Sequence, residues 1–310
     1  MSDCIVVTNP MAADKNVRAP CGTIHDRLVL ESLNHMHPSA HKLRQAIAAN
    51  RTVIGTFLVE FTGPAVLHCL ADAGFDFAVL DCEHGNHDSR EVESILETAY
   101  QAEFCLLVRP PNTDRGLITR VLDAGAAGVL IPAIDSLDAV HQAVKATKYS
   151  PVGKRGVHLF RGHTRHRRVE AARFLAEANR ELLTLIQIEL KSAVDVVDRI
   201  AAIEGVDGLY VGPGDLSVDL GVPGQWNAPP VQEAIAATAR ACRENKKIAG
   251  CHFNDVNELA SLKQSGVQML GYRCDAAMFK TAAEQLIESV RDRLPSKTGE
   301  RIESSILAKA

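Results

Sequence analysis

Hydrophobic residues recur along this chain as short continuous runs, separated by longer stretches that have helical periodicity. The short runs are bounded by glycine, proline or charged residues, which is typical of strands buried on both faces. They predict strands at residues 53–59, 77–80, 104–108, 128–131, 183–189, 208–211, 247–251 and 267–272. The longer stretches predict helices at residues 43–49, 64–73, 89–102, 114–124, 136–148, 191–202, 229–245, 254–265 and 275–293.

Glycine marks the ends of several predicted helices, directly before the next strand. Such glycines are typical of helix C-caps, where the backbone turns left-handed. They are Gly74, Gly125, Gly205 and Gly266. Strands that alternate with helices predict parallel βαβ units, and eight such units with right-handed crossovers close most economically into a (β/α)8 TIM barrel. A doubly wound open sheet is the alternative, but no G-x-G-x-x-G follows the first strand.

The two ends of the chain lack this regular pattern. We predict an N-terminal arm at residues 1–40 with one short helix at most, at residues 24–33, and a C-terminal tail at residues 296–310. The arm either docks on a neighbouring subunit or is disordered. Its histidines, with His41 just beyond it, resemble a metal cluster only superficially. The barrel itself, at residues 41–295, is the predicted catalytic domain.

Composition narrows the class of protein. The 310 residues carry a net charge of −4 without a basic block, which argues against nucleic acid or an anionic membrane as a partner. We find no apolar run of membrane-spanning length and no signal peptide. The eight cysteines form no C-x-x-C pair, and several lie inside apolar runs. They predict reduced, core-filling thiols in a cytoplasmic protein.

Polar residues concentrate at the C-terminal ends of the predicted strands, where TIM barrels carry their chemistry. Asp81 and His84 follow the second strand and Arg109 the third, whereas Asp123 lies less directly, on the helix after the third strand. Gln187 and Glu189 end the fifth strand, and Asp215 follows the sixth after the turn Gly212-Pro213-Gly214.

The residue types at this predicted edge suit metal-assisted enolate chemistry. Two hard carboxylates, Glu189 and Asp215, without nearby Cys or His ligands suit Mg²⁺, Mn²⁺ or Co²⁺ rather than caged zinc. Arg109 supplies a fixed cation for a developing enolate oxygen, and His84 is the candidate acid/base, with Asp123 or Asp81 orienting its ring. Each residue also has an ordinary interpretation, such as a Glu189–Arg109 salt bridge, an N-cap at Asp215 or a structural histidine.

One irregular segment, residues 150–168, interrupts the pattern before the fifth strand. Four arginines and two histidines fall within residues 161–168. A helix-to-strand loop normally lies on the face away from the active site, which predicts a solvated basic loop. The alternative is a long lid that brings cations to an anionic substrate.

Taken in order, these motifs resemble the HpcH/HpaI family of metal-dependent class II pyruvate aldolases, in the phosphoenolpyruvate/pyruvate TIM-barrel superfamily. The resemblance runs from about residue 43 to residue 294. It is carried by Ile54-Gly55-Thr56, Ala73-Gly74-Phe75-Asp76, Asp81-x-Glu83-His84, Val108-Arg109-Pro110, Leu122-Asp123-x-Gly125, Arg155-Gly156-Val157, Gln187-Ile188-Glu189, Gly205-Val206-Asp207-Gly208 and Gly212-Pro213-x-Asp215-Leu216-Ser217. The chain departs from the family at Cys82, where a small residue is usual, and at residues 161–166.

The resemblance implies a role for each residue of the site. It implies that Glu189 and Asp215 bind the metal, and that Gln187 with the amides around Gly214 and Asp215 holds the pyruvate carboxylate. It also implies that Arg109 polarises the keto oxygen. His84 and Asp123 match a dyad for proton transfer, and Asp81 matches an acidic residue near the aldehyde.

The expected activity is reversible cleavage of 4-hydroxy-2-oxo acids through a pyruvate enolate. No lysine ends a predicted strand, which argues against a Schiff-base aldolase. A CoA-thioester lyase of the citrate lyase β or malyl-CoA lyase type is the alternative, and a non-catalytic barrel is a third hypothesis. The resemblance further implies a homohexamer with exchanged C-terminal helices. The sequence does not name the aldehyde, the stereochemistry or the preferred ion.

Overall fold

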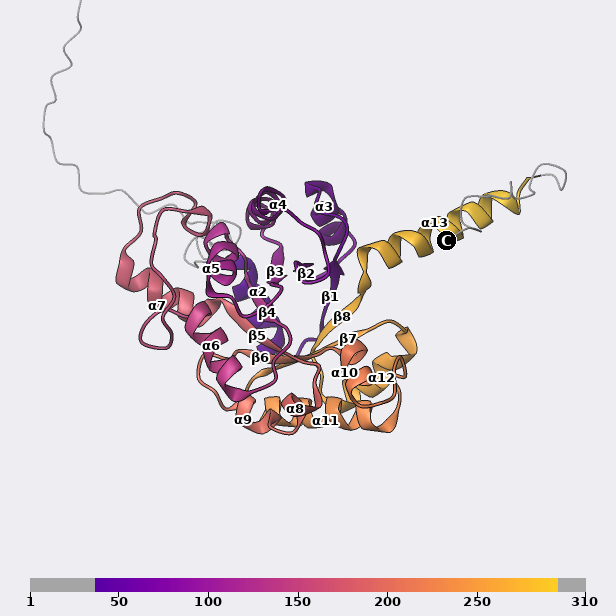
Figure 1. Cartoon of the computed structure of the whole chain (residues 1–310). Coiled ribbons are helices and arrows are strands. Elements are labelled where there is room, and N and C mark those ends of the chain that lie inside the picture. Colours follow the sequence, from indigo (N-terminus) through magenta and orange to yellow (C-terminus); the bar gives the residue numbers. More distant parts are fainter. Residues whose placement is uncertain (1–36, 295–310) are drawn as a thin grey trace, which may run out of the picture. The chain divides into compact units, whose positions relative to one another are not determined.

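Eight parallel strands close into a barrel in this computed structural model, which describes residues 37–294. Each strand pairs with its neighbours in sequence, and β1 pairs with β8 to complete the circle (Figure 1). The strands are β1 (Val53–Leu58), β2 (Phe77–Asp81), β3 (Cys105–Arg109), β4 (Gly128–Ile131), β5 (Leu183–Ile188), β6 (Gly208–Val211), β7 (Ile248–Phe253) and β8 (Met269–Cys274). The predicted TIM barrel is confirmed, and every strand boundary lies within two residues of its predicted position.

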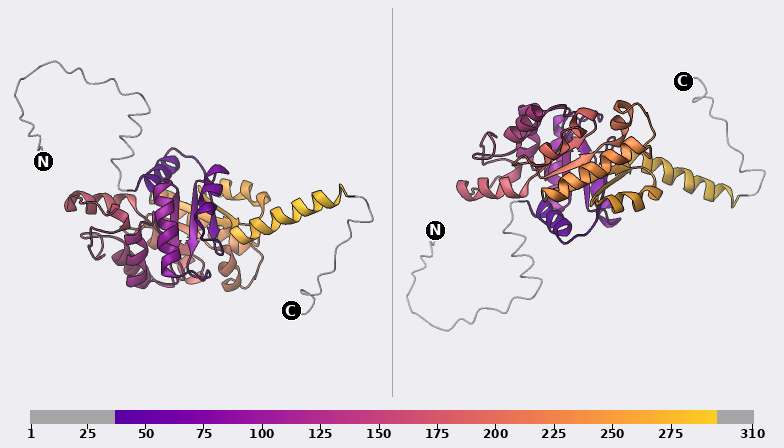
Figure 2. Two further views of the ribbon diagram at one scale, coloured as in Figure 1. Left: turned by 90° about the horizontal axis from the view of Figure 1, so that it is seen from above. Right: turned by 90° about the horizontal axis from the view of Figure 1, so that it is seen from below.

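Helices connect the strands and cover the outside of the barrel, as the two views in Figure 2 show. They are α2 (Pro38–Ala48), α3 (Pro64–Asp72), α4 (Ser89–Gln101), α5 (Arg115–Ala124), α6 (Leu137–Thr147), α7 (Ala171–Glu181), α8 (Lys191–Val194), α9 (Val197–Ala201), α10 (Pro213–Asp219), α11 (Pro229–Glu244), α12 (Leu259–Ser265) and α13 (Asp275–Arg291). Single 3₁₀ turns lie at Gly162–Thr164 and Val256–Glu258. No helix among residues 37–294 is long and apolar enough to cross a membrane.

Local chemistry explains where these helices begin and end. Asp88 begins α4 with a capping box, because its carboxylate accepts from the amides of Arg90 and Glu91 while Glu91 reaches back to the amide of Asp88. The four glycines predicted to follow helices all have left-handed backbones, with φ between 89° and 112°. An L-residue with a Cβ is disfavoured in that region, so glycine ends these helices at low cost.

Several helices differ from the predictions. The helix predicted at 43–49 begins earlier, at Pro38, because proline is favoured in the first helical turn. The segment predicted at 191–202 is divided into α8 and α9. The helix α7, which follows the irregular segment at residues 150–168, was not predicted; only Phe174, Ala178 and Glu181 in it are buried. The helix predicted at 24–33 and the tail at 296–310 lie outside the described residues.

Two apolar clusters hold the barrel together. One lies between the strands and the surrounding helices, and the other fills the barrel interior. The interior cluster includes Phe77, Leu107 and Tyr210, and α2 adds Leu43 and Ile47 to it. The helix α2 therefore packs against the interior at the N-terminal ends of the strands. Truncating one of these buried side chains to alanine costs about 2–5 kcal/mol.

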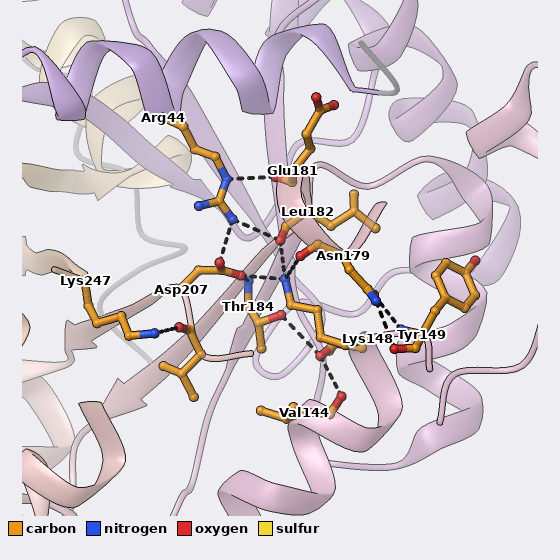
Figure 3. A network of polar contacts seen from close by, with 12 residues as sticks. Arg44, Val144, Lys148, Tyr149, Asn179, Glu181, Leu182, Thr184, Asp207 and Lys247 are labelled. Carbon is orange, nitrogen blue, oxygen red and sulfur yellow. Dashed lines mark hydrogen bonds and ion pairs between the residues drawn. The ribbon is translucent and has the colours of Figure 1, made fainter. Parts of the chain in front are cut away.

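A buried polar network lies at those N-terminal ends (Figure 3). Lys148 is 1% exposed, and its Nζ donates to the carbonyls of Asn179 (3.1 Å) and Leu182 (2.7 Å) and to Oδ2 of Asp207 (2.7 Å). Arg44 pairs with Oδ1 of Asp207 at 2.7 Å and also donates to Leu182. Burial opposes the charge on Asp207, but Lys148 and Arg44 outweigh it and lower the pKa of its carboxyl. Every proton on Lys148 has an acceptor, so this network is closed.

The helix α13 differs from the others because it extends away from the barrel (Figure 1). Asp275, its first residue, is its only buried one. Asp275 ties the start of the helix to the segment that follows β1, since one carboxylate oxygen accepts from the amides of Val59, Glu60 and Phe61. Further along, Phe279, Leu286, Ile287 and Val290 are between 47% and 68% exposed. This helix therefore presents apolar side chains to solvent.

Candidate active site

A pocket of about 270 Å³ opens at the C-terminal ends of the strands, which we call the mouth of the barrel. Its lining includes Asp81, His84, Arg109, Gln187 and Asp215, all predicted from the sequence. The structure therefore brings residues from β2, β3, β5 and the segment after β6 to one place. The alternation of strands and helices explains this, because parallel strands of a barrel end on the same side.

Arg109 is held in the mouth by a bidentate ion pair with Asp81. The two residues lie opposite each other in the β2–β3 register, and Nε and Nη2 of Arg109 donate to the carboxylate at 2.9 and 2.5 Å. Burial opposes the charge on Asp81, but Arg109 outweighs it and lowers the pKa of the carboxyl. Nη1 of Arg109 also lies 3.1 Å from Glu83. The geometry places Asp81 as the residue that orients Arg109.

Glu189 lies just beyond β5 and is 4% exposed. Oε1 accepts from the amide of Ala133 at 2.5 Å, and Oε2 accepts from Nε2 of Gln187. Burial raises the pKa of Glu189, and the charge of nearby Asp215 raises it further. Two carboxylates therefore share one region of the mouth, at an electrostatic cost that a cation would relieve.

The residues around Glu189 fit a hard divalent cation. Gly212 lies beside the pair, and an added Cβ there would come within 2.8 Å of Gln187 Nε2 and 3.2 Å of Glu189 Oε2, so only glycine keeps this space clear. Oε1 of Gln187 is buried without a hydrogen-bond partner among the described residues. Carboxylate and amide oxygens suit Mg²⁺ or Mn²⁺, with water and substrate as the remaining ligands. Among residues 37–294, no three or more His, Cys, Asp or Glu side chains lie together in a way that could hold a metal ion.

His84 and Asp123 are not brought together within the chain. His84 is exposed in the turn after β2, where its amide lies 3.3 Å from Asp81 Oδ1. Asp123 lies near the C-terminal end of α5 and pairs with Arg155 Nη2 at 2.5 Å. Because α5 runs antiparallel to the strands, its C-terminus lies at the end of the barrel opposite the mouth. The His84–Asp123 dyad therefore stays a prediction that one chain alone does not assemble.

The basic loop at residues 150–168 packs against α4 and α5. Arg161 pairs with Glu93 at 3.0 Å, and the guanidinium of Arg165 lies 4.4 Å from the centre of the Tyr100 ring. His163 contacts the Asp123 carbonyl at 2.9 Å. None of residues 150–168 lines the mouth pocket. The structure therefore favours the solvated-loop interpretation over a lid on the chain's own site.

Six further residues line the pocket that sequence reasoning did not select: Phe57, Val59, Tyr210, Trp226, His252 and Cys274. His252 contacts the rings of both Phe57 and Trp226, at centroid distances of 5.1 and 5.9 Å. Burial lowers the pKa of His252 to about 4, so the imidazole is neutral near pH 7. No local signal marks these residues. Trp226, the chain's one tryptophan, lies in an irregular segment, and His252 lies inside an otherwise apolar strand.

Comparison with known proteins shows the family of this chain. The model of the HpcH/HpaI aldolase/citrate lyase family matches residues 54–282, most of the chain. The chain belongs to this family. The chain is also similar to a hydroxypyruvate/pyruvate aldolase of Roseovarius nubinhibens, with 30% identity over 256 residues that cover 83% of this chain and 99% of the relative. A 5-keto-4-deoxy-D-glucarate aldolase of Escherichia coli is 32% identical over 251 residues, covering 81% and 97%.

Solved structures support the same membership. The crystal structure of an HpcH/HpaI aldolase from Desulfitobacterium hafniense DCB-2 superposes with a TM-score of 0.77 at 33% identity. That superposition covers 82% of this chain and 98% of the other. The protein is thus a carbon–carbon lyase of the class II pyruvate aldolase type in the HpcH/HpaI family.

Proposed function

We propose that this HpcH/HpaI aldolase cleaves and forms 4-hydroxy-2-oxo acids through a pyruvate enolate, with a divalent ion held by Glu189 and Asp215. The observation that carries the proposal is the placement of a fixed guanidinium and Asp215 in one small pocket, with the buried carboxylate of Glu189 near enough to Asp215 and Arg109 to interact electrostatically with both. Mg²⁺, Mn²⁺ and Co²⁺ suit this ligand set. Such an ion, when bound, supplies Lewis-acid stabilisation of negative charge on the keto oxygen of the substrate.

The protein's own residues supply position and permanent charge. Arg109 stays protonated, because Asp81 more than compensates for burial and raises the pKa of the guanidinium. Held by Asp81, it cannot turn away from an enolate oxygen, which is the preorganisation that makes such groups effective. Nε2 of Gln187 has a second proton besides the one it donates to Glu189, and the first-turn amides of α10 at Gly214 and Asp215 have no acceptor within the helix, so these groups are the proposed donors to the pyruvate carboxylate.

His84 is the proposed group that moves the proton to or from the aldehyde-derived hydroxyl. It lies on the exposed turn after β2 and lines the pocket, so it reaches both substrate and solvent. Among the described strands, none ends in lysine, which supports enolate chemistry over a Schiff base. Oxaloacetate decarboxylation requires the same enolate and is the expected side activity.

Exchange of the pyruvate methyl protons in deuterated water, followed by proton NMR with Mg²⁺ or Mn²⁺, tests this proposal. We expect metal-dependent exchange in the wild type, loss to the metal-free level in Glu189→Gln, and a decrease of about 100-fold or more in Arg109→Gln. Glu204→Gln, at an exposed glutamate outside the pocket, is the matched control and should exchange normally.

Two further measurements are needed to interpret the exchange test: the unfolding temperature of the Glu189→Gln variant and the dependence of exchange on metal. Glu189→Gln should unfold at no lower temperature than the wild type, because the raised pKa means that its charge destabilises the fold at neutral pH. Exchange without metal, or none with any 2-oxo acid, would reject the proposal. A panel of aldehydes, run beside acyl-CoA acceptors, then separates the aldol lyase from the CoA-thioester alternative.

We also propose that the enzyme is a homo-oligomer, with a hexamer as the expected state. The exposed apolar side chains of α13 support this, because a helix with such a face is normally covered by another element. Sedimentation of the full chain measures the mass directly, and a monomer at micromolar concentration would contradict the proposal.

We also propose that the protein is cytoplasmic, since thiols stay reduced in that compartment. Cys69, Cys82, Cys105, Cys242, Cys251 and Cys274 are free thiols. Burial raises the pKa of Cys105 and that of Cys242 to about 12, so both are unreactive core residues.

A further inference from the structure

A second and larger pocket, of about 830 Å³, lies at the end of the barrel opposite the mouth. We call it the basal pocket. The C-terminal ends of α2, α11 and α12 surround it, and the start of β7 contributes to its wall. Its ionisable lining consists of Arg44, Asp207, Arg243, Lys246, Lys247 and Lys263. Five cations and one carboxylate thus face a cavity in a chain whose net charge is −4.

The single carboxylate of the basal pocket is already neutralised. Asp207 is bound by Lys148 from beneath and by Arg44 from the pocket wall, at 2.7 Å each. Figure 3 shows both cations converging on it. The remaining four cations therefore have no acidic partner within the pocket lining.

These four cations are also largely free of other acceptors. Lys247 donates from Nζ to the Val206 carbonyl at 2.6 Å and retains its two other protons. Arg243, Lys246 and Lys263 form no side-chain hydrogen bond or ion pair with any residue in the described part of the chain. Arg243 extends toward the end of α12, where its Nη1 would lie 3.7 Å from a Cβ added at Gly266. Cations from two helices therefore face one space.

Helix dipoles explain only part of this accumulation of positively charged side chains in the basal pocket. Lysine and arginine are favoured in the last turn of a helix, and Arg243 and Lys263 hold such positions in α11 and α12. Three helix C-termini bring about half a negative charge each, roughly −1.5 in all. Four cations exceed that, and Lys246 and Lys247 lie outside the helices. The basal pocket therefore keeps an excess of positive charge.

We propose that the basal pocket binds a small organic molecule that carries two or more phosphate groups. Arginine binds phosphate with a fork of donors and lysine binds it as a point charge, and both are present on separate walls. A volume of about 830 Å³ is within the range of small-molecule sites. An extended polyanion such as nucleic acid fits less well, because the chain as a whole carries a net charge of −4.

Calorimetric titration of the full-length, metal-free protein with pyrophosphate at low salt tests the proposal. The absence of divalent metal prevents the mouth from recruiting phosphate through an ion. We expect saturable binding by the wild type and a dissociation constant at least about tenfold higher in the double variant Arg243→Gln/Lys263→Gln. Inorganic phosphate should bind more weakly than pyrophosphate, since it reaches fewer of the cations.

A matched double variant separates a built site from a general electrostatic field. Lys145 and Arg199 also lie in the last turns of helices, α6 and α9, but outside the basal pocket. Lys145→Gln/Arg199→Gln should bind pyrophosphate like the wild type. Equal loss in both double variants would overturn the proposal, as would no saturable binding, undiminished binding by Arg243→Gln/Lys263→Gln, or equal affinity for phosphate and pyrophosphate.

The result does not depend on the folding of one variant. Lys246→Gln changes an exposed side chain in a turn and should weaken pyrophosphate binding without lowering the unfolding temperature. Binding unaffected by Lys246→Gln in a folded protein would count against the site. Since no activity is measured, failure here leaves the aldolase proposal untouched.

Discussion

The two ends of the barrel each hold a buried ion pair, but the pairs serve different purposes. At the N-terminal end, Asp207 is matched by Lys148 and Arg44, and backbone carbonyls satisfy the remaining donors of Lys148. At the mouth, Asp81 fixes Arg109, while burial and the charge of nearby Asp215 raise the pKa of Glu189. A closed network holds structure, whereas an incompletely neutralised one retains the capacity to bind. This division agrees with the general rule that TIM barrels place stability at one end and chemistry at the other.

The sharpest test of this comparison is to remove the central charge at the N-terminal end. Asp207→Asn leaves Lys148 buried without its counter-ion, so the free energy of unfolding should fall by about 3–5 kcal/mol. Urea unfolding measures this change. Asp195→Asn, which breaks an exposed pair with Lys191, should cost less than about 1 kcal/mol.

The rate of pyruvate proton exchange tests whether the ion pair at the N-terminal end of the barrel affects activity at the mouth. Any Asp207→Asn protein that remains folded should exchange pyruvate protons at the wild-type rate per folded molecule. Loss of exchange without loss of stability would show that the two ends are not functionally separate.

The titration of a buried histidine should have a smaller effect on the free energy of unfolding. His37, at the start of α2, is 3% exposed and contacts the Gly125 carbonyl through Nε2 at 2.9 Å. Burial lowers its pKa from 6.5 to about 4. Between those values the unfolded chain binds a proton that the folded chain does not, so stability falls as pH falls.

Replacing His37 removes its share of this pH dependence. From pH 7 to pH 5, that share is about 2 kcal/mol, so the stability of His37→Gln should fall less than that of the wild type by this amount. Urea unfolding at the two pH values measures the difference.

His252 provides the comparison at the mouth. Burial lowers its pKa similarly, but its side chain is half-buried and lines the pocket, so water reduces the energetic consequence. His252→Gln should therefore flatten the pH dependence less than His37→Gln. The opposite order would mean that His252 at the mouth is shielded from water more than His37 at the N-terminal end.

Much of this architecture could be predicted from local pattern. Buried strands have continuous apolar runs, and left-handed caps favour glycine, so each unit could be identified without its neighbours. The helix α7 was not predicted although its sequence is amphipathic, because it directly follows the irregular basic segment and only three of its residues are buried. Trp226 and His252 were not selected, because residues that line a pocket do not recur at regular intervals in the sequence. The partner of Asp123 could not be predicted, because Arg155 reaches it from a distant irregular loop.

The sequence by itself determined the order of strands and helices, the side of the barrel that carries Asp81, Arg109 and Glu189, and the family. These depend on periodicity, caps and strand ends, which are properties of adjacent residues. Only the tertiary structure decided that Asp81 fixes Arg109, that Asp123 faces away from His84, and that cations from α11, α12 and the turn before β7 gather at the basal pocket. The physical reason is that side-chain pairing depends on distances between elements far apart in the chain, and closure of the barrel sets those distances.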